Sequence, residues 1–264
     1  MITAATPAVP RLAVRARDVL GCEWIKLRSI RSTYLIILIA AVTALGLSSL
    51  IADMKAIAAP GRPPGDSMLP TFLGMPYAAL ATGLLGVLAF SSEHGTGQVR
   101  TTFAAVPRRR AVLAAKAAVA GALALALGEA LAFASFFLVQ ALLARRHDGL
   151  SLTQPGVPGK VLAEGAILCV CALLGVGLGA IIRHTAGSIA ALFGLIALPA
   201  ILLTLPAPWT DRIGRFTLLF AALQVAVQHP RPGLFSPALS MLVLLAWAAA
   251  VLATAAVAIT RRDA

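Results

Sequence analysis

The sequence predicts an all-α integral membrane protein, and three observations carry this prediction. Hydrophobic residues make up 59% of the 264 residues and charged residues only 12%, whereas soluble domains carry about 25% charged residues. The mean hydropathy is +0.91. Apolar runs of about 20 residues, enough to cross a hydrocarbon core about 30 Å thick, recur along the chain. No stretch between them is long enough to form a soluble domain.

The net charge of +12 is high enough to suggest nucleic-acid binding. However, the 22 Lys and Arg residues are scattered in short connections between apolar runs, not gathered on one basic domain. Membrane topology explains this distribution better, so we expect no nucleic-acid partner. Cys22, Cys169 and Cys171 match no disulfide framework. The last two point to different faces of a helix, so we expect no metal site.

Residues 1–32 form the first predicted region, a basic cytosolic segment. Its apolar residues gather toward one side of a helical wheel, although Glu23 intrudes on that side. This pattern is typical of an amphipathic helix in the membrane interface, with Trp24 at headgroup level. A solvated basic tail is the alternative. A signal peptide fits poorly, because the following apolar run exceeds the usual length of about 7–15 residues.

Residues 33–264 form the second region, a membrane domain with six predicted spans. Asp53 and Lys55 are expected to end the first span, and a Pro- and Gly-rich loop follows. The apolar segment 216–227 is too short to cross and predicts a re-entrant or interfacial helix before the last span. The predicted spans are about 33–52, 72–90, 112–143, 161–182, 186–205 and 237–260.

Two spans carry further signals. The third apolar run is longer than one crossing requires, and Lys116 is expected to mark its interface with water. In the fourth span, Gly175 and Gly179 provide a face of small residues that favours close helix packing. Few polar residues separate the fourth span from the fifth, which predicts a tight hairpin.

The distribution of basic residues predicts the orientation. With six spans both termini lie on one side, together with the connection between the second and third spans. That side holds 14 of the 22 Lys and Arg residues. We expect a multi-pass protein of the cell (plasma) membrane, and the positive-inside rule predicts that its N- and C-termini and the connection between spans two and three are cytoplasmic.

The segment from Glu93 to Lys116 is a polar, basic island between two long apolar runs. Ser91 or Ser92 can cap a helix there, Glu93 complements the helix dipole in its first turn, and Pro107 stops it. These signals predict a short cytosolic helix over about 93–105. A simple polar connection with a topology-setting basic cluster is the alternative.

The island resembles the segment between the second and third spans of type-2 ABC transporter permeases. The resemblance rests on Glu93-x-x-x-Gly97, the hydroxyl pair Thr101–Thr102, Pro107 with the arginines after it, and Lys116. Residues 23–34, EWIKLRSIRSTY, look like the segment that leads into the membrane in bacterial members of that family. The six-span layout also fits, so the resemblance covers nearly the whole chain.

The resemblance implies a permease subunit of an ATP-driven exporter, not an enzyme. Such permeases pair as two membrane subunits, as homodimers or heterodimers, and dock on cytosolic ABC ATPases. The chain would bind no cofactor itself, because ATP and Mg belong to the ATPase. In agreement, the sequence contains no Gly-x-x-x-x-Gly-Lys-Ser/Thr phosphate loop.

The resemblance also implies functional residues. The segment between spans two and three would be the coupling helix that receives the ATPase stroke, and the N-terminal helix would pack beside it. The implied coupling residues are Glu93, Gly97, Arg100, Thr101, Pro107, Arg108 and Lys116, and the N-terminal helix contributes Glu23, Trp24, Lys26 and Arg28.

Glu129 lies near the middle of the third span. A charged residue there costs about 2.5–3.5 kcal/mol on insertion scales, so it should face the bundle interior, a cavity or a partner. It is either a translocation-path or proton-linked group, or a hydrogen-bonded packing residue. An ion- or proton-coupled secondary transporter that uses Glu129 is therefore an alternative function, although no inverted repeat is evident.

An intramembrane enzyme is a further alternative with less support. His94, His147, His184 and His229 are expected in connections, no His-Glu-x-x-His motif occurs, and no paired acidic residues share a helix face within a span. The transported substrate is not specified, because apolar walls would suit a lipophilic drug, a lipid or a peptide.

Overall fold

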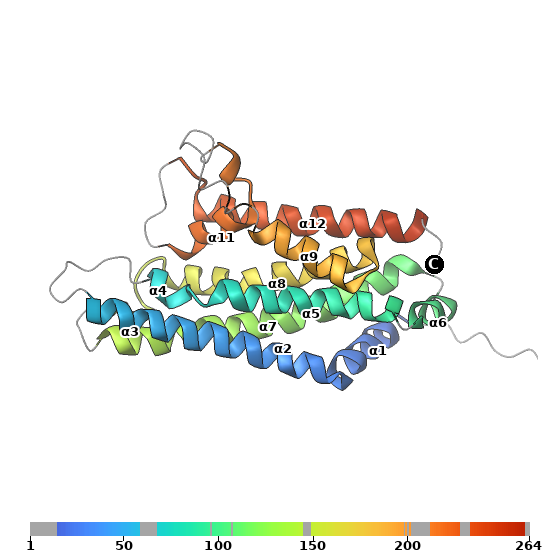
Figure 1. The fold of residues 1–264 in the computed structure, drawn as a ribbon, viewed down its shortest axis with the longest axis horizontal. Coiled ribbons are helices and arrows are strands. Elements are labelled where there is room, and N and C mark those ends of the chain that lie inside the picture. The colour runs from blue at the N-terminus through green and yellow to red at the C-terminus, as the bar shows by residue number, and fades with distance from the viewer. Residues whose placement is uncertain are drawn as a thin grey trace, which may run out of the picture.

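The computed structural model shows a bundle of α-helices (Figure 1), with no strand in the part of the chain that it describes. The described residues are 15–58, 68–95, 97–106, 108–144, 149–197, 199, 201, 212–227 and 233–261. Within these ranges, five helical segments are long and apolar enough to cross a membrane: Arg31–Met54, Met68–Gly95, Arg109–Ala144, Val157–Ile182 and Pro237–Arg261. The chain thus has the architecture of an all-α, multi-pass membrane protein.

The predicted sixth crossing, 186–205, is described only in part. Its helix α9, Thr185–Ala197, is shorter than the five long segments, and residues 198, 200 and 202–205 lie outside the described residues. The six-span count therefore stays a prediction. The other helices are α1 (Ala16–Ser29), α2 (Arg31–Ala41), the π-helix η1 (Val42–Leu47), α3 (Ser48–Ala58), α4 (Met68–Phe72), α5 (Met75–Gly95), α6 (Gln98–Ala105), α7 (Arg109–Ala144), α8 (Val157–Ile182), α11 (Leu218–Ala226) and α12 (Pro237–Arg261).

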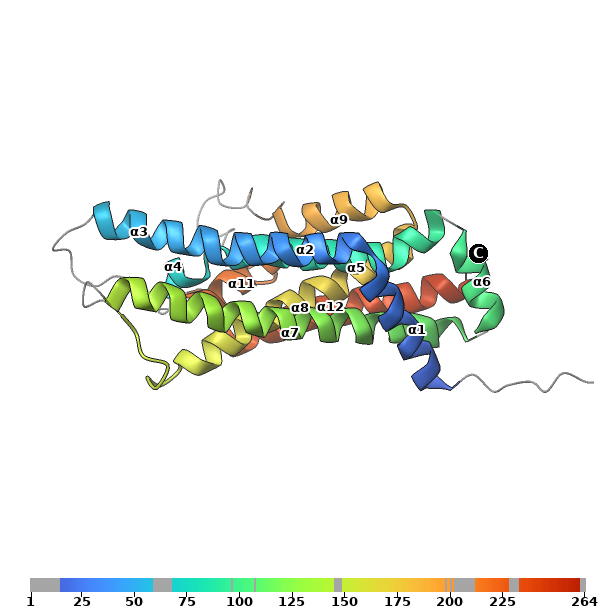
Figure 2. The ribbon, with the colours of Figure 1, turned by 90° about the horizontal axis from the view of Figure 1, so that it is seen from below.

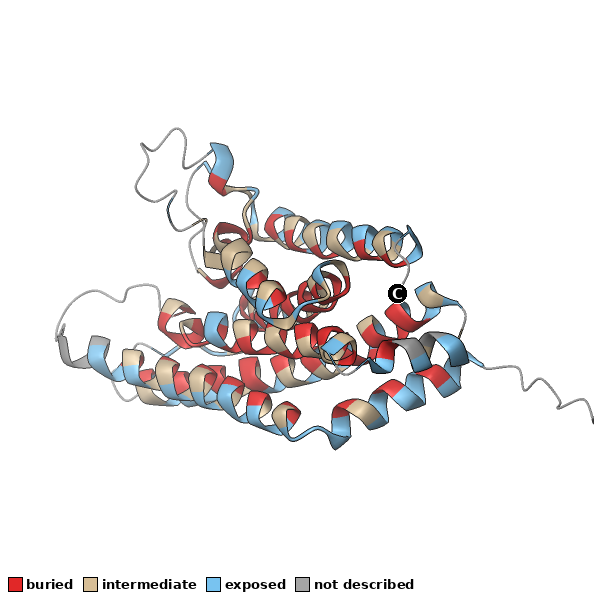
Figure 3. Ribbon diagram, turned by 45° about the vertical axis from the view of Figure 1, so that its right-hand side comes forward, coloured by how far each residue is buried: buried red, intermediate tan, exposed pale blue. Residues whose placement is uncertain are grey.

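Helix α8 forms the centre of the bundle and packs against α5, α7 and α12. Its buried positions cover most of its circumference, whereas the outer helices carry exposed faces (Figure 3). The α5–α8 crossing depends on glycine: a Cβ on Gly175 would collide with the carbonyl oxygen of Gly83, and one on Gly179 would lie 2.9 Å from Val87 O. The predicted small-residue face is confirmed, and it lets the two backbones approach closely.

The first long segment is one continuous helix made of α2, η1 and α3. Asp53 was expected to end it, but the helix continues to Ala58. The π-helical turn faces the corner between α4 and α5, where a Cβ on Gly74 would collide with Thr43 O, and Gly74 N donates to Ser48 Oγ at 3.0 Å. The loop expected after this helix, residues 59–67, lies outside the described residues.

Helices α1 and α6 and the end of α12 gather at one end of the bundle (Figures 1 and 2). There, Arg109 Nη1 at the start of α7 donates to Ile259 O near the end of α12, at 3.2 Å. The tight hairpin between α8 and α9 is also confirmed, because a single left-handed residue, Arg183 (φ 59°), caps α8. Helices α3, α4 and α11 lie at the opposite end (Figure 1).

Helix α11 is the short helix expected before the last span. Leu218, Phe220 and Val225 are buried, and so is Gln224, which interrupts the apolar pattern. The helix packs against α12 and α8. It is therefore part of the packed bundle at this end and not an isolated surface helix.

The α5–α8 crossing gives the first testable prediction. Replacing Gly175 with Ala should lower the melting temperature of the purified protein in detergent, because overpacking a tight contact costs about 1–3 kcal/mol. The matched control is Gly194→Ala in α9, where an added Cβ meets nothing within 4 Å. That variant should be unchanged or slightly more stable, because Ala is the better helix former. Equal melting temperatures for the two variants would contradict the close crossing.

Candidate functional site

The polar island differs from its predicted form at its beginning. Helix α5 continues through Gly95, so Ser91 and Ser92 lie inside it and do not cap a new helix. Ser92 Oγ donates to Leu88 O at 2.6 Å, as expected for a residue within a helix. The break comes at Gly97, whose φ of 72° is readily adopted only by glycine, and α6 begins at Gln98. The prediction of one helix over 93–105 is therefore wrong, and Glu93 belongs to the last turn of α5.

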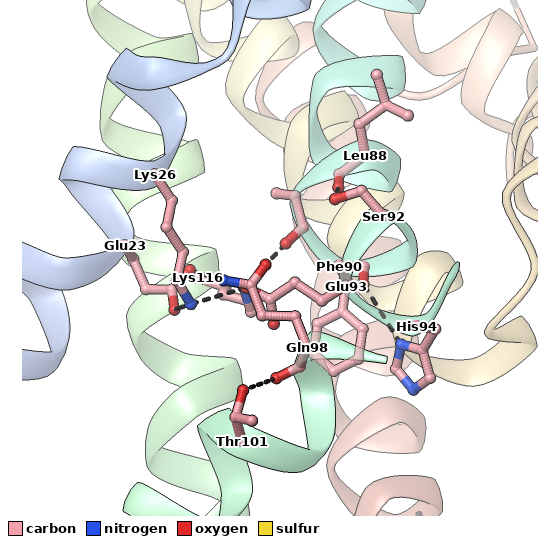
Figure 4. Close-up of polar contacts among 11 residues, drawn as sticks. Glu23, Lys26, Leu88, Phe90, Ser92, Glu93, His94, Gln98, Thr101 and Lys116 are labelled. Carbon is pink, nitrogen blue, oxygen red and sulfur yellow. Dashed lines mark hydrogen bonds and ion pairs between the residues drawn. The ribbon is translucent and has the colours of Figure 1, made fainter. Parts of the chain in front are cut away.

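This placement points Glu93 toward α1 and α7 (Figure 4). Lys116 Nζ of α7 lies 2.7 Å from Glu93 Oε1 and 2.7 Å from Glu23 Oε2 of α1. It also donates to Ala89 O at 3.0 Å, so all three of its donors have acceptors. The Lys116 side chain is only 1% exposed. Lys116 therefore lies inside the bundle, and its expected depth at the membrane interface stays a prediction.

Lys26 completes the group from α1. Its Nζ lies 2.8 Å from Glu23 Oε1 and 2.8 Å from Glu93 Oε1, and its side chain is 22% exposed. Burial acts to lower the pKa of Lys26, but hydrogen bonds to Glu23 and Glu93 outweigh it and the pKa is raised. The stabilisation from charged Lys26 is therefore complete below its ordinary pKa and lost only as the pH rises past the raised value.

Glu23, Lys26, Glu93 and Lys116 together form what we call the ion-pair cluster. Two carboxylates balance two ammonium groups, which makes burial of the charges tolerable. The cluster joins α1, α5 and α7 at the end of the bundle that also carries α6. A displacement of one helix relative to the others would separate these charges, so the ion pairs favour fixed relative positions of the three helices.

The other residues implied by the resemblance lie outside the cluster. Trp24 is 47% exposed, and Arg28, Thr101 and Arg108 are also exposed. Thr101 Oγ1 donates to Gln98 O at 2.8 Å within α6. Gly97 forms the turn into α6. Pro107 and the side chain of Arg100 lie outside the described residues.

Glu129 is remote from the ion-pair cluster. It lies on α7 against α8, where a Cβ on Gly165 would come within 2.6 Å of Glu129 Cδ. Its Oε2 is buried and has no hydrogen-bond partner among the described residues. The side chain of Glu129 is thus half-buried against α8, and whether it serves the interior, a cavity or a partner stays a prediction.

Sequence reasoning missed one buried carboxyl group. Glu164 on α8 is only 4% exposed, and its Oε1 has no hydrogen-bond partner in the described part of the chain. The available signal was the same as for Glu129, an acidic residue inside an apolar run. His94, expected in a connection, instead lies in the last turn of α5 with its ring stacked on Phe90. Among the described residues, no group of three or more His, Cys, Asp or Glu side chains could hold a metal ion.

Comparison with known proteins adds no identification: neither a scan against protein-family models nor a search of curated proteins finds a match.

The ion-pair cluster gives a second prediction. Lys116→Met should destabilise the protein by about 3–5 kcal/mol, because it leaves two buried carboxylates with a single cation. Adding Glu93→Gln should recover part of this loss, because Glu23 and Lys26 then remain as a neutral pair. Melting curves of the single and double variants in detergent measure both effects.

The control for this prediction is Arg108→Met, which removes an exposed cation from the same end of the bundle. Its stability should stay within about 0.5 kcal/mol of the wild type. A double variant less stable than Lys116→Met alone would show that the two side chains do not stabilise the bundle as a pair.

Proposed function

We propose that this chain is the membrane subunit of an ATP-driven exporter, driven by a separate cytosolic ATPase. The observation that carries the proposal is the position of α6. This short helix lies between the two long apolar segments that end in α5 and begin with α7. Buried ion pairs join the adjacent parts of α5 and α7 to α1. An exposed helix on such a base is suited to receive a force from another protein. The motif resemblance supports the same role.

In this proposal, α6 is the coupling helix. Movement of α6 displaces the last turn of α5 and the first turns of α7. The ion-pair cluster carries this displacement to α1, because separating any one helix would leave a buried charge unpaired. ATP and Mg are held by the partner, and this chain supplies the membrane path together with a second permease, identical or different.

The orientation in the plasma membrane is part of the proposal. Helices α1 and α6 and the end of α12 share one end of the bundle (Figure 2), and among the described residues that end carries most of the Lys and Arg side chains. The positive-inside rule then favours a cytoplasmic location for α6, where an ATPase can reach it.

Photo-cross-linking tests this proposal in native cells. Benzoylphenylalanine at Thr101, an exposed position of α6, should cross-link to a chain that contains a nucleotide phosphate loop. The same group at Ser151, which is exposed in the segment between α7 and α8, should not. Thr101→Arg should reduce the ATPase that copurifies with the permease at least several-fold, with an unchanged melting temperature. Absence of a phosphate-loop protein at Thr101, with both positions expressed at the wild-type level, would refute the coupling role.

Glu129 favours a second candidate function, a proton- or ion-coupled secondary transporter. Its Oε2 is buried against α8 with no hydrogen-bond partner among the described residues, so this carboxyl group could bind and release a proton. Under this alternative, Glu129→Gln should abolish the dependence of transport on the proton gradient. Under the ATP-driven proposal, transport by the wild type and by Glu129→Gln should depend on ATP and not on the proton gradient. Measuring transport in vesicles with ATP alone or with a proton gradient alone separates the two.

A further inference from the structure

A cavity of about 70 Å³ is lined by residues of α4, α5, α8, α9, α11 and α12. Helices α4 and α11 lie at the end of the bundle opposite α6 (Figure 1). On the same measure a water molecule needs about 10–15 Å³, so the cavity can hold more than one water-sized group. Its walls are almost entirely apolar. They include Phe72, Ala79, Ile167, Leu218, Ala222 and Leu244.

One carboxyl group interrupts these walls. Glu164 lines the cavity, is 4% exposed, and its Oε1 has no hydrogen-bond partner in the described part of the chain. Lys160, one helical turn earlier on α8, is the nearest cation in the sequence, but its Nζ donates to Val227 O at 2.6 Å. Cys171 is the other titratable residue in the lining, and a thiol provides no counter-ion.

The chemistry of the lining restricts the ligand. A water molecule in a buried site needs about two to four polar partners, and this cavity offers one carboxyl group. A bound Ca²⁺ or Mg²⁺ ion needs about six or more oxygen ligands, which the apolar walls do not supply. A lipophilic ammonium ion requires one carboxylate for its charge and apolar contact for its hydrocarbon part, and the cavity offers both.

We propose that this cavity binds a small lipophilic ammonium ion, with Glu164 as the acceptor for its N–H groups. An ionised carboxylate buried in apolar surroundings is costly unless it is paired, so the ligand provides the missing charge. The binding site does not depend on an ATPase partner. If the chain is a permease, as proposed above, lipophilic amines are also a class of substrate that it transports.

Binding to the purified full chain tests the site directly. The protein is placed in nanodiscs of zwitterionic lipid, which avoids attraction of the cation to anionic headgroups. Equilibrium dialysis then compares benzylamine with benzyl alcohol, a neutral molecule of similar size, with empty nanodiscs as background. Benzylamine should bind at least about tenfold more tightly, because a charge-assisted hydrogen bond to a buried carboxylate is stronger than a neutral one.

Three variants decide the assignment. Glu164→Gln should remove the preference for benzylamine and leave the binding of benzyl alcohol unchanged. The control, Asp53→Asn, removes an exposed carboxylate outside the cavity lining and should change the binding of neither ligand. Ala222→Leu should weaken both ligands by filling the cavity while Glu164 remains, so it also tests the site if Glu164→Gln fails to fold. Equal binding of both ligands by the wild type, or a preference that persists in Glu164→Gln, would overturn the site. Because no ATPase is present, neither result depends on the proposed coupling.

Discussion

The burial of Glu23, Glu93 and Lys116 at one end of the bundle, with the half-buried Lys26 beside them, is the constraint on which the rest of the structure depends. Lys116 donates to carboxylates from α1 and α5 at 2.7 Å each, although these residues are 93 and 23 positions away in the sequence. A buried charge without its partner is far less stable than a complete set of pairs. The ends of α1, α5 and α7 must therefore keep their relative positions, and α6, which lies between α5 and α7, has a firm base.

The opposite end of the bundle has a different chemistry. There α4, α11 and their neighbours surround an apolar cavity with a single carboxyl group, Glu164. Charges are balanced within the protein at the α6 end, whereas the carboxyl group at the cavity end has no counter-ion within the described residues. Between the two ends, close glycine contacts hold α5 against α8. If the chain is a permease, this rigid crossing connects the force-receiving end to the ligand-binding end.

The sequence predicted more of the fold than of the site. The all-helical fold class, five long apolar helices, the α8–α9 hairpin and the Gly175–Gly179 face depend on local composition and spacing, and the structure confirms them in its described part. The predicted beginning of the helix over 93–105 was wrong, because Ser91 and Ser92 are plausible caps until α5 is seen to continue through them. Gly97 is an alternative point at which the new helix could begin, and only the folded backbone shows that α6 begins there and not after Ser91 or Ser92.

By itself, the sequence determined that the chain forms apolar helices with a basic island between two of them, because hydropathy and periodicity are local properties. It also provided Glu23, Lys26, Glu93 and Lys116 as separate candidate functional residues, with Glu23 as a charged residue in an otherwise apolar helix face. Only the tertiary structure decided that Glu23 lies on the buried face of α1 with Val19 and Leu27 and that the four charged side chains meet. Electrostatic pairing between distant segments depends on how the helices pack, and no local pattern records that packing. The same reason explains why Glu164 was recognised only when the cavity around it was seen.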